Sequence, residues 1–182
     1  MTTTAAARLK TLDLIYISLF AVLLAVCAWI AIPTLVPFTL QTLAVFLTGS
    51  LLGSRKGMAA MLIYLLLGLV GLPVFSGFKS GLGHLLGPTG GYLLGFLLGI
   101  PLIGLAAKPG KTWVLALGML GALLLCYAFG TAWFMVVYAQ KSGSVGLFTV
   151  LSWCVFPFII PDLLKLGLAL GLSRRLKPYI KA

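Results

Sequence analysis

The sequence predicts an all-α integral membrane protein, a bundle of six transmembrane helices, on the basis of three observations. Hydrophobic residues make up 62% of the 182 positions, charged residues make up only 8%, and the mean hydropathy is +1.19. A soluble domain of this size could not bury so much apolar surface. The apolar residues form long runs, and the basic residues cluster in the short segments between them. We therefore expect one membrane domain over residues 1–182, embedded in a lipid bilayer.

The six expected spans are apolar runs that end at proline, glycine or basic residues. They cover approximately residues 12–32, 40–52, 58–72, 92–107, 112–137 and 153–172. The first run is longer than the hydrophobic region of a signal peptide, about 7–15 residues, so we interpret it as a retained span. The second, third and fourth runs are short for a complete crossing. Part of the adjoining loops is therefore expected to enter the membrane, where irregular backbone must line a cavity or pack against protein.

The basic residues predict the orientation of the chain. If both termini lie inside the cell, the inner face collects Arg8, Lys10, Arg55, Lys56, Lys108, Lys111, Arg174, Arg175, Lys177 and Lys181. The outer face then has only Lys79 and Lys141. Such an asymmetry is typical of membrane orientation and explains the net charge of +11 without nucleic-acid binding. We expect a multi-pass protein of a bacterial-type plasma membrane with both termini in the cytoplasm.

Two charged residues inside the last span predict a binding site. Asp162 lies 12 residues before Arg174, which is about 18 Å along a helix and well inside a hydrocarbon core about 30 Å thick. A charge at that depth costs about 2.5–3.5 kcal/mol and needs a partner or a water-filled cavity. Lys165 follows at i+3, on the same helix face. We expect these two residues to pair and to bind a ligand.

The two outer loops supply further candidate ligand contacts. In PFTLQ, Thr39 and Gln41 stand where the chain re-enters the membrane, although helix capping by Thr39 is an equal alternative. In the glycine-rich loop of residues 73–91, glycines allow close approach of the backbone to a ligand. Phe75 and Tyr92 at its ends could cover an apolar ligand, or they could be packing residues or interfacial anchors.

Several function classes are excluded by the scarcity of acids. The only other acid, Asp13, stands near Arg8 and Lys10 at the membrane edge, where a solvated charge is expected. A membrane metalloenzyme or aspartyl protease needs further carboxylates or histidines, so we expect neither an enzyme nor a metal site. The phosphate-binding pattern GxxxxGK[ST] is absent, so we expect no ATP hydrolysis by this chain and no cofactor.

Small residues at four-residue spacing predict close helix packing. Ala21 and Ala25 form such a pair in the first span, and Gly91, Gly95 and Gly99 form a stripe in the fourth. The first interpretation is packing within the chain. The alternative is a docking face for another membrane subunit, for which Ala21 and Ala25 are the best candidates.

The ordered motifs PFTLQ, LTGSLLGSRKG, GLPVF, SGLGHLLGPTGGYLLGF and PFIIPDLLK resemble BioY, the biotin-binding S component of energy-coupling-factor (ECF) transporters. The resemblance covers nearly the whole chain, and GPTGGY and the late D-x-x-K are its more specific parts. It implies a six-helix protein that captures biotin from outside. It also implies docking, through Ala21 and Ala25, on a transmembrane T component that carries two ABC-type ATPases.

The chemistry of biotin suits the candidate residues. Asp162 could accept from the ureido N–H groups, and Lys165 could donate to the ureido carbonyl or keep Asp162 charged. Gln41, Thr39 and the loop backbone around Gly81 would complete the polar contacts, and Phe75 and Tyr92 would cover the apolar rings. Lys79 is the candidate partner of the biotin carboxylate, whereas His84 is expected to be a loop residue. The alternatives are a stand-alone secondary carrier and an S component for another vitamin.

Overall fold

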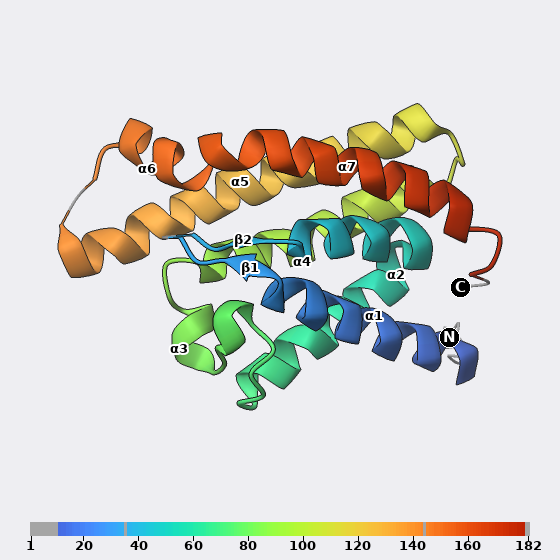
Figure 1. Ribbon diagram of the computed structural model, residues 1–182, viewed down its shortest axis with the longest axis horizontal. Helices are drawn as coiled ribbons and strands as arrows, with labels where there is room; N and C mark the ends of the chain where they lie inside the picture. The colour runs from blue at the N-terminus through green and yellow to red at the C-terminus, as the bar shows by residue number, and fades with distance from the viewer. Residues whose placement is uncertain (1–10, 35, 144, 181–182) are drawn as a thin grey trace, which may run out of the picture.

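The computed structural model describes residues 11–34, 36–143 and 145–180, and these residues form a bundle of helices (Figure 1). Five helices in the described part are long and apolar enough to cross a membrane. They are α1 (Thr11–Trp29), α2 (Gln41–Leu69), α4 (Gly90–Ala107), α5 (Thr112–Ser142) and α7 (Phe156–Leu176). The shorter elements are β1 (Ala31–Ile32), β2 (Phe38–Thr39), the 3-10 helix η1 (Ser76–Phe78), α3 (Leu82–Leu85) and α6 (Leu147–Cys154). The all-α membrane class is therefore confirmed.

The expected count of six spans differs from the structure by one, because the second and third predicted spans belong to the 29-residue helix α2. This helix is interrupted at Gly53, whose φ of 73° and ψ of −174° are not helical. The chain folds back there, and Figure 1 shows the second part of α2 returning beside the first. A hydrogen bond of 3.0 Å from Gln41 Nε2 to Tyr64 Oη joins residues that a straight helix would hold about 34 Å apart. Glycine is required at the break because a side chain there would be strained.

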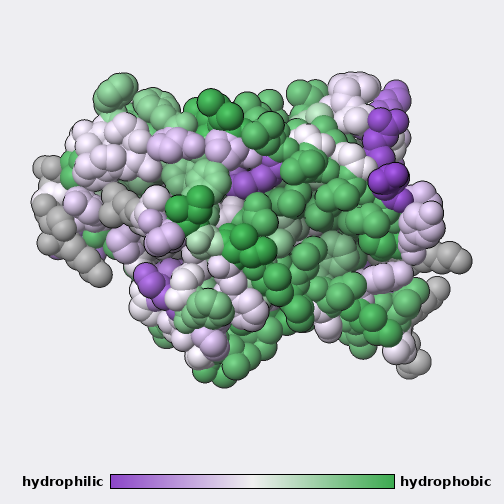
Figure 2. Space-filling model, in the orientation of Figure 1, coloured by the Kyte–Doolittle hydropathy of each residue, from purple (hydrophilic) through white to green (hydrophobic). Residues whose placement is uncertain are grey.

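Two ends of the molecule differ in composition. The break in α2, the α4–α5 turn, the start of α1 and the carboxyl end of α7 lie at one end, on the right in Figure 1. This basic end carries Arg55, Lys56, Lys108, Lys111, Arg174, Arg175 and Lys177, and Figure 2 shows strongly hydrophilic residues there. The predicted inward-facing Arg8, Lys10 and Lys181 lie outside the described residues. The opposite end holds the β1–β2 hairpin, η1 and α3, and it carries Lys79.

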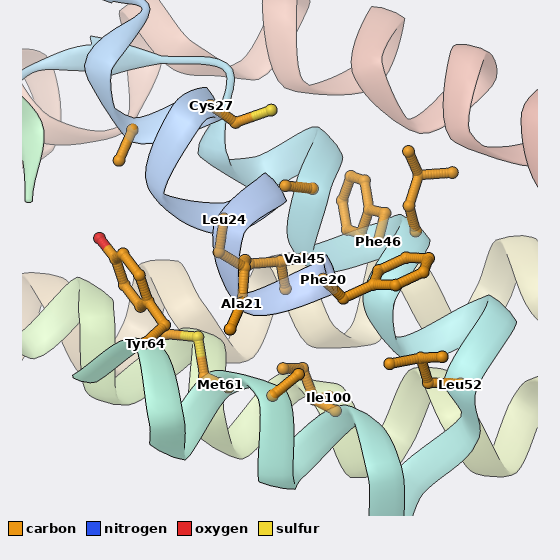
Figure 3. Close-up of a cluster of buried hydrophobic side chains, with 14 of the residues drawn as sticks. Phe20, Ala21, Leu24, Cys27, Val45, Phe46, Leu52, Met61, Tyr64 and Ile100 are labelled. Carbon is orange, nitrogen blue, oxygen red and sulfur yellow. The ribbon is translucent and has the colours of Figure 1, made fainter. Parts of the chain in front are cut away.

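The main core forms where α1 packs against α2 and where α2 packs against α4 (Figure 3). Ala21 and Ala25 lie inside this core, with only 2% and 5% of their surface exposed. Their side chains are therefore covered within the bundle, as the packing interpretation expects, and their docking of a partner subunit stays a prediction. Their small side chains let α1 approach α2 closely. Gly99 serves the same purpose in α4, because an added Cβ would lie 3.1 Å from Ala122 Cβ of α5.

Candidate functional site

A cavity opens near the hairpin end of the bundle, between the start of α2, the loop before α4, α5 and α7. Its empty volume is about 660 Å³ including its mouth. Its polar lining comes from the hairpin and α2 (Thr39, Gln41, Thr42), the loop before α4 (Ser76, His84, Thr89), and α4, α5 and α7 (Tyr92, Tyr127, Asp162, Lys165). Its apolar lining includes Val36, Leu93, Phe96, Leu123 and Phe158. The cavity therefore combines a few convergent polar groups with apolar walls.

The predicted pair of Asp162 and Lys165 lies in this cavity. Lys165 Nζ is 2.7 Å from Asp162 Oδ1, and the two side chains are 6% and 4% exposed. Lys165 Nζ also donates to the Thr39 carbonyl oxygen at 2.7 Å and lies 4.6 Å from the centre of the Phe38 ring. Because Thr39 and Phe38 belong to β2, the ammonium connects the outer hairpin to α7. The buried charge is thus compensated by a carboxylate, a carbonyl and a ring face.

Tyr127 of α5 completes the coordination of Asp162. Its hydroxyl donates to Asp162 Oδ2 at 2.7 Å. Both carboxylate oxygens therefore accept a hydrogen bond, one from Lys165 and one from Tyr127. Sequence reasoning missed Tyr127, since a tyrosine in an apolar span is usually a packing residue. Its register opposite Asp162 depends on how α5 packs against α7, which no local pattern encodes.

Gln41 and Thr39 lie at the wall formed by the start of α2. The amide nitrogen of Gln41 donates to Tyr64 Oη, and its backbone N–H donates to Thr39 Oγ1 at 3.2 Å. Thr39 thus holds the start of the helix with its side chain while its carbonyl binds Lys165, so the capping-type alternative describes its hydroxyl. Within the described residues, the amide oxygen of Gln41 accepts no hydrogen bond. That oxygen is free to meet a donor in the cavity.

Aromatic side chains form the remaining walls. Tyr92 is 9% exposed, lines the cavity as expected, and has its hydroxyl 3.5 Å from Thr131 Oγ1. Phe158 stacks on Phe38 with ring centres 5.3 Å apart. Phe96 and Tyr127 lie along the same cavity. The walls could therefore enclose a flat, largely apolar ligand.

Three predicted contacts do not reach this cavity. Phe75 is fully buried beneath the loop, where its ring lies 5.6 Å from Tyr64 and 5.2 Å from His84. Lys79 is exposed and lines a separate outer cavity. Gly81, with φ of +85°, donates its N–H to the Gly68 carbonyl at 2.7 Å, so it fixes the loop to α2. The loop thus folds onto α2 and presents other residues to the cavity.

His84, Ser76 and Thr89 are the loop side chains that line the cavity in their place. Burial lowers the pKa of His84, and the nearby Lys79 ammonium lowers it further. The Ser76 hydroxyl is buried and has no hydrogen-bond partner among the described residues. His84 also lines the outer cavity, so it stands between the two. The sequence pattern did not single out Ser76, because a serine in a glycine-rich loop is typical of any turn.

The described residues contain no group of three His, Cys, Asp or Glu side chains that could hold a metal ion. Cys126 and Cys154 line the cavity as free thiols, and Cys27 lies buried in α1. The polar groups of the cavity are therefore hydrogen-bond donors and acceptors around one ion pair. Such a set suits reversible binding of a small molecule.

Comparison with known proteins gives concordant results. The model of the BioY family matches residues 1–182. The chain is 46% identical over 170 residues to the biotin transporter BioY of Thermotoga maritima, covering 91% of this chain and 95% of that protein. It is 36% identical to a probable biotin transporter BioY of Pyrococcus horikoshii, covering 93% and 98%. A crystal structure of the S-component for biotin from an ECF-type ABC transporter superposes with a TM-score of 0.82 at 27% identity, covering 98% of this chain and 95% of the other.

Proposed function

The chain belongs to the BioY family, and from this premise we propose that it binds biotin as the S component of an ECF-type vitamin importer. The family is one of transporters, so the chain is not an enzyme. The observation that carries the proposal is the buried Asp162–Lys165 pair, which lines a cavity together with hydrogen-bonding groups and apolar side chains. The choice of biotin as the ligand follows from the relatives, which are described as biotin transporters.

The contacts proposed for biotin follow from the donors and acceptors of the cavity. The ureido ring of biotin offers two N–H groups and one carbonyl oxygen. The Asp162 carboxylate and the Gln41 amide oxygen are acceptors for the N–H groups, and Lys165 is the donor for the carbonyl. Tyr92 and Phe158 would cover the apolar rings. Because Ser76 and His84 line the cavity and Lys79 does not, we propose Ser76 and His84 as the loop contacts to the rest of the ligand.

Asp162→Asn tests the site. Loss of a hydrogen bond to a charged group costs about 1.5–3 kcal/mol, so we expect biotin to bind about 10- to 150-fold more weakly to this variant in detergent. Asp13→Asn is the matched control, because Asp13 is the only other acid in the sequence and pairs with Lys56 at the basic end. It should bind biotin normally. Unchanged affinity in a folded Asp162→Asn variant would remove the site assignment.

Labelled biotin, with thiamine and riboflavin as competitors, tests the substrate. Displacement by unlabelled biotin alone supports the proposal, whereas no binding by a folded sample contradicts it.

We also propose that a T component with two ABC-type ATPases drives uptake, because the sequence has no phosphate-binding loop of its own. Co-purification with those subunits tests this assembly. ATP-independent uptake by the chain alone in liposomes would favour the stand-alone carrier.

We further propose that the basic end faces the cytoplasm of a bacterial-type cell, with both termini inside. The concentration of arginine and lysine at that end supports this orientation. A membrane-impermeant thiol reagent applied to intact cells should label a Lys79→Cys variant and spare a Lys108→Cys variant. The reverse pattern would contradict the orientation.

A further inference from the structure

A second cavity lies at the basic end, between the α4–α5 turn, the end of the first part of α2 and the end of α7. Its empty volume is about 340 Å³ including its mouth. It shares no lining residue with the cavity of Asp162. From its lining we propose that it binds the phosphate group of an anionic phospholipid.

Three cationic side chains line this cavity. Lys111 comes from the α4–α5 turn, and Arg174 and Lys177 come from the carboxyl end of α7. Lys177 Nζ donates to the Ala107 carbonyl at 3.1 Å, which holds one wall in place. At the floor, the Ser50 and Ser173 hydroxyls are 2.6 Å apart and buried. The cavity is therefore polar at its base and positive at its mouth.

The protein has almost no acids with which to neutralise these cations. The sequence contains only two aspartates and no glutamate. Asp13 binds Lys56 and Asp162 binds Lys165, and neither lysine lines this cavity. Three cations gathered around one cavity repel each other, and an anion that enters it relieves that repulsion. The membrane-orientation rule explains why basic residues lie at this end, but not why three of them surround a cavity.

Two exposed aromatic residues near the cavity indicate that it lies at the level of the lipid headgroups, which favours a lipid as the source of the anion. Trp113 follows Thr112 of the cavity wall and is 63% exposed, and Tyr179 follows α7 and is 78% exposed. Exposed tryptophan and tyrosine at the ends of membrane helices lie at the level of the lipid headgroups. Basic pockets between transmembrane helices bind anionic headgroups at that level. Arginine and lysine donors together suit a phosphodiester.

The test is a titration of the full-length chain in detergent with phosphatidylglycerol, followed by native mass spectrometry of the lipid-bound species. Phosphatidylcholine, which is neutral overall, is titrated in parallel. We expect phosphatidylglycerol to bind the wild-type chain more tightly, and Lys111→Gln/Arg174→Gln to weaken it about tenfold or more. The matched control is Lys108→Gln/Arg175→Gln, which removes two charges at the same end but outside the cavity and should keep binding. Lys111→Arg/Arg174→Lys keeps the charge and should also keep binding.

Equal losses in the two charge-removing double variants would overturn the proposal, because the attraction would then be general. Equal binding of the two lipids to the wild-type chain would overturn it as well. Millimolar inorganic phosphate that displaces phosphatidylglycerol from the chain would identify a soluble anion, not a lipid, as the ligand. Biotin binding by each variant reports whether it has folded.

Discussion

Removing one member of the Asp162–Lys165 pair should destabilise the protein strongly, because the remaining charge is then buried without its partner. In a Lys165→Met variant, the Tyr127 hydroxyl is the one side-chain donor to Asp162 that remains among the described residues, and the Thr39 carbonyl loses the Lys165 ammonium. Breaking a buried ion pair on one side costs about 3–5 kcal/mol, since an uncompensated charge remains. Asp162→Leu should cost a similar amount, because the ammonium is then left with the Thr39 carbonyl and the Phe38 ring.

The double variant Asp162→Leu/Lys165→Met removes both charges, so its loss should be smaller than the sum of the two single losses by about 2–3 kcal/mol. Unfolding equilibria in mixed micelles measure all three variants. The Asp13–Lys56 pair is the comparison. Asp13 is buried and not solvated as the sequence suggested, but Lys56 is 24% exposed against 6% for Lys165, so the coupling of this pair should be the smaller of the two. A double-variant loss equal to the sum of the single losses would refute the argument that the charges compensate each other.

The remaining predictions concern packing, access and pH. Gly104→Ala would place a methyl group against the Ser54 backbone and should lower stability by about 1–3 kcal/mol, whereas Gly121→Ala, with open space around it, should gain up to about 1 kcal/mol. Equal thermal midpoints for the two variants would contradict this packing. Biotin should slow alkylation of Cys126 and Cys154, which line the cavity, but not of Cys27, and uniform rates measured by peptide mapping would argue against binding there. Because the folded pKa of His84 lies below its ordinary 6.5, its contribution to stability is present above pH 6.5 and is lost as pH falls through the folded value. His84→Gln should reduce this acid-side loss in a thermal scan, and an identical pH profile would exclude the histidine as its cause.

The sequence could predict those features that depend on local spacing. Long apolar runs indicate membrane helices, and the i, i+3 spacing of Asp162 and Lys165 places them on one helix face, where they pair at 2.7 Å. Thr39, Gln41 and Tyr92 also line the cavity, because they stand where the chain enters the helices around it.

The features that sequence reasoning missed depend on contacts between distant segments. Ala21 and Ala25 have the spacing of a close-packing face, but the whole bundle decides which neighbour that face of α1 meets. Phe75 is an aromatic residue in a loop beside the cavity, yet the loop folds inward and buries it against Tyr64. Tyr127 reaches Asp162 across α5 and α7, which is a matter of helix register. Gly53 has a positive φ of 73°, and this residue breaks α2 between the two apolar runs that the sequence presents as separate spans.

The separation of the two cavities has a consequence for how a solute can cross the bundle. The ligand cavity and the cavity at the basic end have no wall in common, and fully buried side chains of the core, such as Ile100 and Met119, lie in the helices that connect the two ends. In this conformation the packed core of the described residues lies between the two cavities. A solute that crosses from one cavity to the other therefore requires the packed helices between them to rearrange.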